Sequence, residues 1–274
     1  MIDLNQLCVH TITMKQWSLE ESIQAFGKAG IGGITIWRDA LGERSVEEVK
    51  ALLTAHKLDL TAYCRGGFFP SLTASERQAA IDDNLTMIRE ASALGAPLIV
   101  LVCGAAAGQS LAESRTQIQA GIEAILPLAE ELNVKLAIEP LHPMYADTRS
   151  AINTLASANN MAEAIDSPYV GVAIDVYHVW WEPDLQAEIE RCGKHNNIFA
   201  YHICDWKVPT TDLLLDRGLM GEGCIDIDQI TGWVRDAGFK GRSEVEIFSK
   251  EYWSLPGDQW FAQILTASKS LEQI

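Results

Sequence analysis

Residues 134–140 read VKLAIEP, residues 170–176 read VGVAIDV, residues 198–204 read IFAYHIC, and residues 243–248 read SEVEIF. Each segment is short, apolar, and rich in β-branched or aromatic residues, which is typical of buried parallel strands. Near the end of each segment one ionisable residue interrupts the apolar run, and these residues are Glu139, Asp175, His202 and Glu246.

Four earlier segments show the same pattern, at residues 7–14, 32–37, 60–64 and 97–103. Amphipathic stretches separate the segments: Ile118, Ile122 and Ile125 recur at helical spacing. Two helix starts carry a serine followed three residues later by glutamate, and these pairs are Ser18 with Glu21 and Ser45 with Glu48. Gly30 and Gly95 are expected to end helices. Eight strands alternating with eight helices predict an α/β fold, a (β/α)₈ TIM barrel that forms a single domain over residues 1–274.

A doubly wound sheet is the alternative architecture for such an alternation. A nucleotide-binding sheet of that kind has a glycine-rich turn after its first strand. Here residues 10–15 read HTITMK, without glycine, and no phosphate-binding loop motif occurs anywhere in the chain. The barrel is therefore favoured.

The composition limits the classes of partner. The chain has 21 basic and 37 acidic residues and a net charge of −16, which disfavours nucleic acids and anionic membranes but leaves room for a small anionic ligand beside a local arginine. The N-terminus has no signal-peptide pattern, and the longest apolar run, residues 96–108, is too short to span a bilayer. Six cysteines without a C-x-x-C pair indicate reduced, mostly buried thiols. We expect a cytoplasmic protein.

The carboxyl ends of barrel strands meet at one face, where these folds hold their active sites. Buried charges without partners are costly, and no lysine or arginine is adjacent in sequence to the four ionisable residues. Three carboxylates and one imidazole predict one divalent metal ion, Mn, Co, Mg or Zn, with a preference for hard ions such as manganese. A purely hydrogen-bonded network is the alternative.

Other polar and aromatic residues at the predicted strand ends are candidates for binding a substrate. These residues are His178, His142, Arg65, Arg217, Trp37 and His10. The alternatives are loop packing for the aromatic residues and surface ion pairs for the arginines. Residues 65–69, RGGFF, are expected to form a mobile aromatic flap that hinges on the two glycines.

Five motifs resemble the sugar phosphate isomerase/epimerase family of the xylose isomerase-like TIM barrel superfamily. They are IEPLHPMYADTRSAINTL (138–155), IDVYHVWW (174–181), YHICDW (201–206), GEGCIDI (221–227) and EVEIF (244–248). The resemblance implies that Glu139, Asp175, His202 and Glu246 bind the metal and that His178 contacts substrate. Glu244 competes with Glu246 for its role, because it lies two residues earlier on the same strand face.

The resemblance also implies a reaction: isomerisation or epimerisation of a sugar, sugar phosphate or keto-polyol by proton transfer through an enediolate held by the metal, with Glu139 and Glu246 as catalytic groups on opposite faces. Two positions depart from the ketose 3-epimerase pattern, because Tyr145 replaces a glutamate and Val208 replaces an arginine. The identity of the substrate thus stays open. Whether the protein forms a homo-oligomer, either a dimer or a tetramer, also stays open.

Two alternatives to this reaction remain: a metal-dependent dehydratase resembling inosose or dehydroshikimate dehydratases, and a non-catalytic sugar-binding barrel subunit. The endonuclease branch of the superfamily binds three zinc ions through additional histidines. Those histidines are absent here, at residues 37–39, 64–66 and 208–210, and the net charge disfavours DNA.

Overall fold

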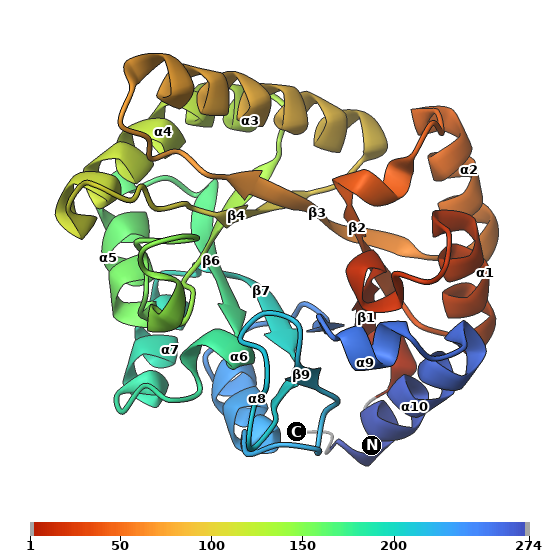
Figure 1. Cartoon of the computed structure of the whole chain (residues 1–274). Coiled ribbons are helices and arrows are strands. Elements are labelled where there is room, and N and C mark those ends of the chain that lie inside the picture. The colour runs from red at the N-terminus through yellow and green to blue at the C-terminus, as the bar shows by residue number, and fades with distance from the viewer. Residues whose placement is uncertain (1–2, 272–274) are drawn as a thin grey trace.

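The structure, a computed structural model that describes residues 3–271, is a closed barrel of eight parallel strands surrounded by helices (Figure 1). Strand order around the barrel is β1-β10-β7-β6-β5-β4-β3-β2. The barrel strands are β1 (Leu7–His10), β2 (Gly33–Trp37), β3 (Asp59–Gly67), β4 (Leu98–Val102), β5 (Lys135–Glu139), β6 (Val170–Asp175), β7 (Ile198–Ile203) and β10 (Ser243–Val245). The predicted fold class is confirmed.

The helices form the outer layer (Figure 1). The α-helices are α1 (Leu19–Ala29), α2 (Val46–His56), α3 (Ala74–Leu94), α4 (Leu111–Glu131), α5 (Leu155–Ile165), α6 (Val176–Val179), α7 (Leu185–Lys194), α8 (Ile227–Asp236), α9 (Lys250–Trp253) and α10 (Gly257–Ser270). Short 3₁₀ turns are η1 (Leu4–Gln6), η2 (Thr11–Met14), η3 (Arg38–Leu41) and η4 (Pro143–Tyr145). Within residues 3–271, no helix has the length and apolar character that crossing a membrane requires.

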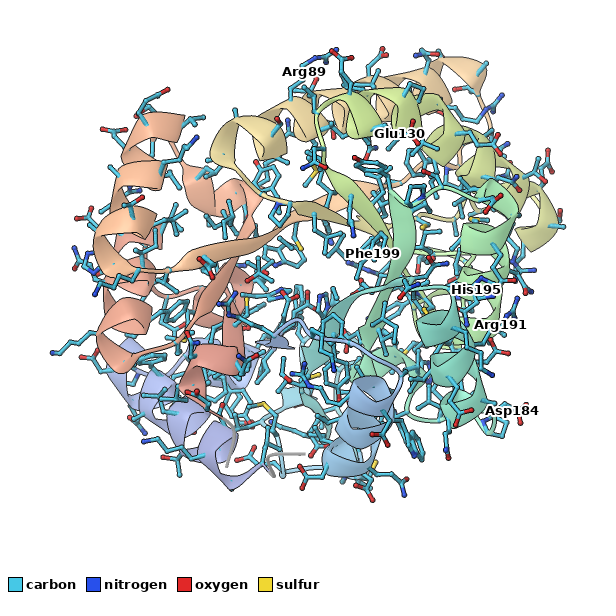
Figure 2. All side chains as sticks on the ribbon, turned by 180° about the vertical axis from the view of Figure 1, so that it is seen from behind. Arg89, Glu130, Asp184, Arg191, His195 and Phe199 are labelled. Atoms are coloured by element: carbon cyan, nitrogen blue, oxygen red, sulfur yellow. The ribbon has the colours of Figure 1, made fainter. Side chains whose placement is uncertain are left out.

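The predicted helix ends agree with the structure. Ser18 and Ser45 each form a capping box with the glutamate three residues on, and Gly30 and Gly95 end α1 and α3 in the left-handed conformation. The thiols agree as well, since all six cysteines are unpaired and only Cys224 is exposed. His195 lies on the outer surface beside Arg191 (Figure 2), with Nε2 3.6 Å from Glu163 Oε1.

The first strand is shorter than its sequence indicates. The apolar run continues to Met14, but β1 ends at His10 and the chain turns into η2. Thr13 joins this turn to β10 and α10. Its hydroxyl donates to Val245 O at 3.0 Å, and its carbonyl accepts from Trp260 Nε1 at 2.9 Å. The run is apolar because η2 is buried.

The predicted flap at residues 65–69 is wrong. Residues 65–67 continue β3, and Phe69 is 1% exposed against α4, although Phe68 faces solvent. Asn84 of α3 binds the amide and carbonyl of Gly67 at 2.7 and 2.8 Å. A Cβ on Gly67 would lie 2.1 Å from Val102 O, so this glycine permits close strand contact instead of a hinge.

Small residues fill the interior of the barrel. Neighbouring strands contribute Ala62, Ala137, Ala173 and Ala200 to one packed cluster, together with Trp37 and Phe248. Strand register then aligns the polar ends: Asp175 pairs with His202, His202 pairs with Glu244, and Val102 pairs with Glu139. Asp175 and His202 thus end neighbouring strands side by side, and Glu139 and Glu246 stand at the ends of β5 and β10.

Candidate metal centre

The four predicted ligands lie together at the carboxyl end of the barrel. Glu139, Asp175, His202 and Glu246 each place one potential ligand atom within 4.8 Å of the others, and all four are buried. Glu139, Asp175 and His202 belong to strands, whereas Glu246 follows β10 and is held by its amide, which donates to Ile203 O at 3.2 Å. The rigid strand ends therefore position all four groups.

Arg217 is a cation within this cluster, so the expectation that no arginine neutralises it is wrong. Its Nη1 lies 2.8 Å from Asp175 Oδ2 and 2.9 Å from Glu246 Oε2. Sequence adjacency missed this contact because Arg217 reaches the cluster from the long segment between β7 and β10, where it forms a small antiparallel pair, β8 (Asp205–Trp206) with β9 (Arg217–Gly218). One guanidinium faces three carboxylates, so the cluster remains rich in negative charge.

The charges of the cluster act on one another. Burial, together with the charges of Glu246 and Glu139, raises the pKa of Asp175 to about 7 against the opposing effect of Arg217. For Glu246, burial opposes ionisation, but Arg217, His10 and His202 outweigh it and hold the pKa of Glu246 well below its usual range. The buried negative charges of the cluster thus disfavour ionisation of Asp175.

The two histidines answer part of this negative charge. Burial favours neutral His202, but the hydrogen bond to Glu139, 3.1 Å from Nδ1, and the neighbouring glutamates raise the pKa of His202 to about 10. The Nε2 atom of His202 is buried and has no hydrogen-bond partner among the described residues. His10 lies between Glu244 and Glu246, at 3.0 and 3.1 Å, and forms a second potential ligand group with His202 and Glu246.

The donor set suits a divalent ion. Three carboxylates and an imidazole are the ligands that Mn²⁺, Co²⁺, Mg²⁺ and Zn²⁺ accept, and their buried charge exceeds what Arg217 neutralises. Glu244 does not belong to this group, because its carboxylate is engaged by His10 and by the Thr35 hydroxyl one layer deeper in the barrel. The residues present therefore fit a single metal.

The predicted substrate-binding residues divide into two groups. His178 lies beside the cluster, with Nε2 3.2 Å from Arg217 Nη2, and the indole nitrogen of Trp37 lies 3.3 Å from His10 Nδ1. His142 instead caps η4 through Met144 N and packs between Trp181 and Trp206. It lines neither cavity at this end of the barrel.

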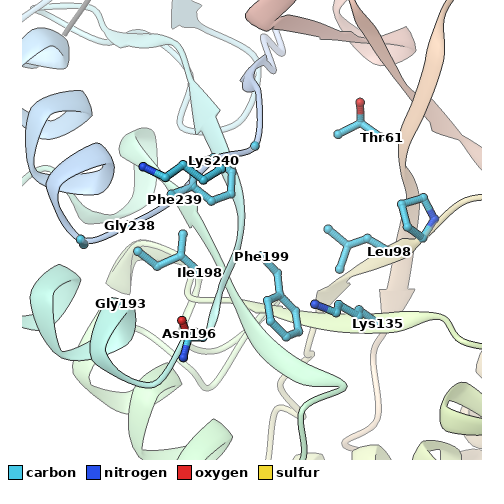
Figure 3. A pocket seen from close by; sticks show the side chains of 13 residues that line it. Thr61, Leu98, Lys135, Gly193, Asn196, Ile198, Phe199, Gly238, Phe239 and Lys240 are labelled. Atoms are coloured by element: carbon cyan, nitrogen blue, oxygen red, sulfur yellow. The ribbon is translucent and has the colours of Figure 1, made fainter.

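Two adjoining cavities open at the carboxyl end. The inner one, about 20 Å³, is lined by Glu139, Glu246, His178 and Arg217, and the outer one, about 630 Å³, by Arg65 and its neighbours. They share four lining residues: Trp37, Arg149, Leu214 and Phe248. A third cavity of about 350 Å³ lies at the opposite end of the barrel, where Thr61, Leu98, Lys135 and Phe199 line it (Figure 3).

Sequence reasoning missed Arg149 and Leu214. Arg149 lies ten residues after Glu139, and its carbonyl accepts from Gly104 N at 2.9 Å, which ties it to the β4 loop. Leu214 lies in the β8–β9 connection, beside Leu213, whose carbonyl accepts hydrogen bonds from the hydroxyls of Tyr145 and Tyr177. Only the position of Arg149 within a recognised motif pointed to the site.

Asp205 proves to be structural. Its buried carboxylate accepts hydrogen bonds from the amides of Trp206, Gly221, Gly223 and Ile225, at 2.8 to 3.0 Å. These bonds shape the GEG turn of residues 221–223 and so fix the segment that carries Arg217.

Solved structures share this architecture. The protein SMc04130 from Sinorhizobium meliloti is 44% identical and superposes with a TM-score of 0.95, over 99% of this chain and 100% of that chain. The IOLI protein, solved with a binding zinc atom, is 21% identical with a TM-score of 0.85, over 97% of each chain.

Sequence comparison identifies the family of this chain. An inosose isomerase of Bacillus velezensis is 24% identical over 98% of this chain and 96% of its own length. The family model described as xylose isomerase-like TIM barrel matches residues 23–271. The chain therefore belongs to the xylose isomerase-like TIM barrel family.

Proposed function

We propose that this protein is a divalent-metal-dependent isomerase or epimerase of a sugar or keto-polyol. The observation that carries the proposal is the buried group of Glu139, Asp175, His202 and Glu246 below an open cavity. The inosose isomerase relative supports the substrate class, and the zinc atom of the IOLI protein supports the metal.

The four residues would hold the ion, and a Lewis acid bound there would polarise a substrate carbonyl and acidify the adjacent C–H bond. The Glu246 carboxylate, buried in this cluster, would accept that proton. Glu139 comes from β5, which β6 and β7 separate from β10, and would return or remove a proton on the other face. Arg217 would donate N–H groups to substrate oxygens beside the cluster, and His178, whose Nε2 accepts from Arg217 Nη2 at 3.2 Å, would hold that guanidinium in place.

Solvent exchange tests the chemistry. Metal-loaded protein incubated in D₂O with inososes and ketohexoses should place deuterium on a carbon beside the carbonyl of one of them. Glu246→Gln should abolish exchange because an amide is no base, while keeping most of the metal because the amide oxygen still coordinates. Glu182→Gln, the same change outside the cluster, should leave exchange intact.

Product analysis separates the related reactions. An isomeric product supports the proposal, and a dehydrated product makes the protein a lyase instead. Turnover without deuterium in carbon would contradict proton transfer and indicate a direct hydride shift. Absence of turnover and of metal in the purified protein would favour a non-catalytic binding subunit.

A further inference from the structure

The outer cavity is unusually basic for so acidic a chain. Its lining includes four cationic side chains, Lys15, Arg38, Arg65 and Arg149, and one acidic residue, Asp39. The whole chain has the opposite balance, with a net charge of −16. A local field of this sign at the entrance attracts anions.

Three of these cations lack an ion pair. Arg38 pairs with Asp83 and Glu90 at 2.7 and 2.8 Å, but across residues 3–271 no carboxylate lies within ion-pair distance of Lys15, Arg65 or Arg149. An acidic chain could readily supply such partners. Because these carboxylate partners are absent, the N–H groups of Arg65 and Arg149 are available to a ligand.

Aromatic rings hold the two free arginines in place. The Arg65 guanidinium lies 5.4 Å from the Trp37 ring and 5.0 Å from the Phe68 ring, and that of Arg149 lies 5.7 Å from the Tyr145 ring. Stacking on a ring face fixes a guanidinium while its in-plane N–H donors stay free. Both arginines are half-buried, so ordering them costs little when a ligand binds.

The same two arginines repel each other. Both line the outer cavity, and burial together with the charge of Arg65 lowers the pKa of Arg149. Arg149 also lines the inner cavity beside Glu139 and Glu246. A ligand bound at the carboxylate cluster therefore has this pair of cations at its other end.

We propose that Arg65 and Arg149 bind an oxyanion, a phosphate ester or a carboxylate, at the end of the substrate remote from the carboxylate cluster. The inference rests on the proposed function for the identity of the ligand as substrate, but anion binding itself does not depend on turnover. Planar guanidinium groups suit both oxyanions through paired N–H donors. Lys15, exposed on the rim, adds charge at the entrance.

Direct titration tests the site. The protein is first treated with EDTA, so that no bound metal contributes to binding. It is then titrated by calorimetry with inorganic phosphate, with acetate, and with neutral erythritol. We expect phosphate or acetate to bind and erythritol not to bind, and the stronger of the two identifies the oxyanion. Arg149→Gln and Arg65→Gln should each weaken binding about tenfold, and Arg149→Lys should retain part of it.

Arg89→Gln is the matched control, because Arg89 is exposed on the outer face of α3 (Figure 2) and its loss changes the net charge equally. Unchanged anion affinity in both folded cavity variants, verified by circular dichroism, would overturn the proposal, as would equal weakening by Arg89→Gln. The deuterium assay fails or succeeds separately: anion binding without exchange contradicts the proposed reaction alone.

Discussion

The two ends of the barrel differ sharply in chemistry. At the carboxyl end, Glu139, Asp175, His202 and Glu246 are buried within 4.8 Å of one another. At the amino end, the cavity in Figure 3 has only two ionisable residues, Lys135 and Lys240, and Lys135 lies over the Phe199 ring at 4.4 Å. Both ends have a cavity, so a hollow alone does not identify a functional site. Clustered, mutually perturbed charge distinguishes the carboxyl end and supports the site proposed there.

The two ends of the barrel also contribute differently to the stability of the fold. Buried carboxylates oppose folding unless cations compensate them, whereas the apolar strand starts stabilise the barrel. The effect of a substitution at the carboxyl end on the unfolding free energy should therefore depend on whether metal is bound. The effect of a substitution at the amino end should not.

Arg217→Met should produce the largest effect. It removes the guanidinium from Asp175 and Glu246, so metal-free protein should lose about 3–5 kcal/mol of unfolding free energy. Added Mn²⁺ or Zn²⁺ should restore much of this loss, because the ion neutralises the same carboxylates. Urea denaturation with and without metal measures both quantities.

Arg191→Met is its control, because Arg191 pairs with Glu163 on the outer helices, partly in solvent, and should cost under about 1 kcal/mol, independently of metal. If metal failed to stabilise Arg217→Met more than wild type, the shared-carboxylate account of this end would be wrong.

Leu98→Ala tests the amino end. Leu98 is buried beside the cavity at the amino end of the barrel (Figure 3), so truncation should lower the unfolding free energy by about 2–3 kcal/mol. Metal content by elemental analysis and deuterium exchange should match wild type at a temperature where the variant is folded. A selective loss of metal in folded Leu98→Ala would break the distinction between the two ends.

The sequence predicted the barrel and the cluster for one reason: strand periodicity places alternate residues on one face, and parallel strands end together. Asp175 and His202 are paired at the ends of β6 and β7, beyond a register shift between Val172 and Ala173, and Glu139 ends the adjoining strand β5. Their role as ligands stays a prediction.

Contacts made by loops could not be predicted in this way. Arg217 and Arg149 reach the site through segments whose course depends on hydrogen bonds such as those to Asp205, and no periodic pattern encodes such a path. The two glycines of residues 65–69 misled for a related reason: glycine permits both hinges and close packing, and only the neighbouring Val102 carbonyl decides between them.

Glu182→Gln should give the smallest effect and extends the comparison beyond the cluster. Glu182 follows α6 at the carboxyl end, and its side chain accepts from Leu155 N at 2.7 Å. Burial raises the pKa of Glu182 from 4.5 to about 7. A carboxyl whose pKa is higher in the folded state destabilises the fold as it ionises, so this contribution grows as pH rises from about 4.5 to 7 and is constant above. Because the side chain is partly solvated, we expect Glu182→Gln to stabilise the protein by only about 1 kcal/mol at pH 8 and to be neutral at pH 4.5. Glu190→Gln, an exposed counterpart on α7, should change stability at neither pH. Thermal unfolding at the two pH values measures the difference, and a gain at pH 4.5 equal to that at pH 8 would show that the buried charge is not its cause.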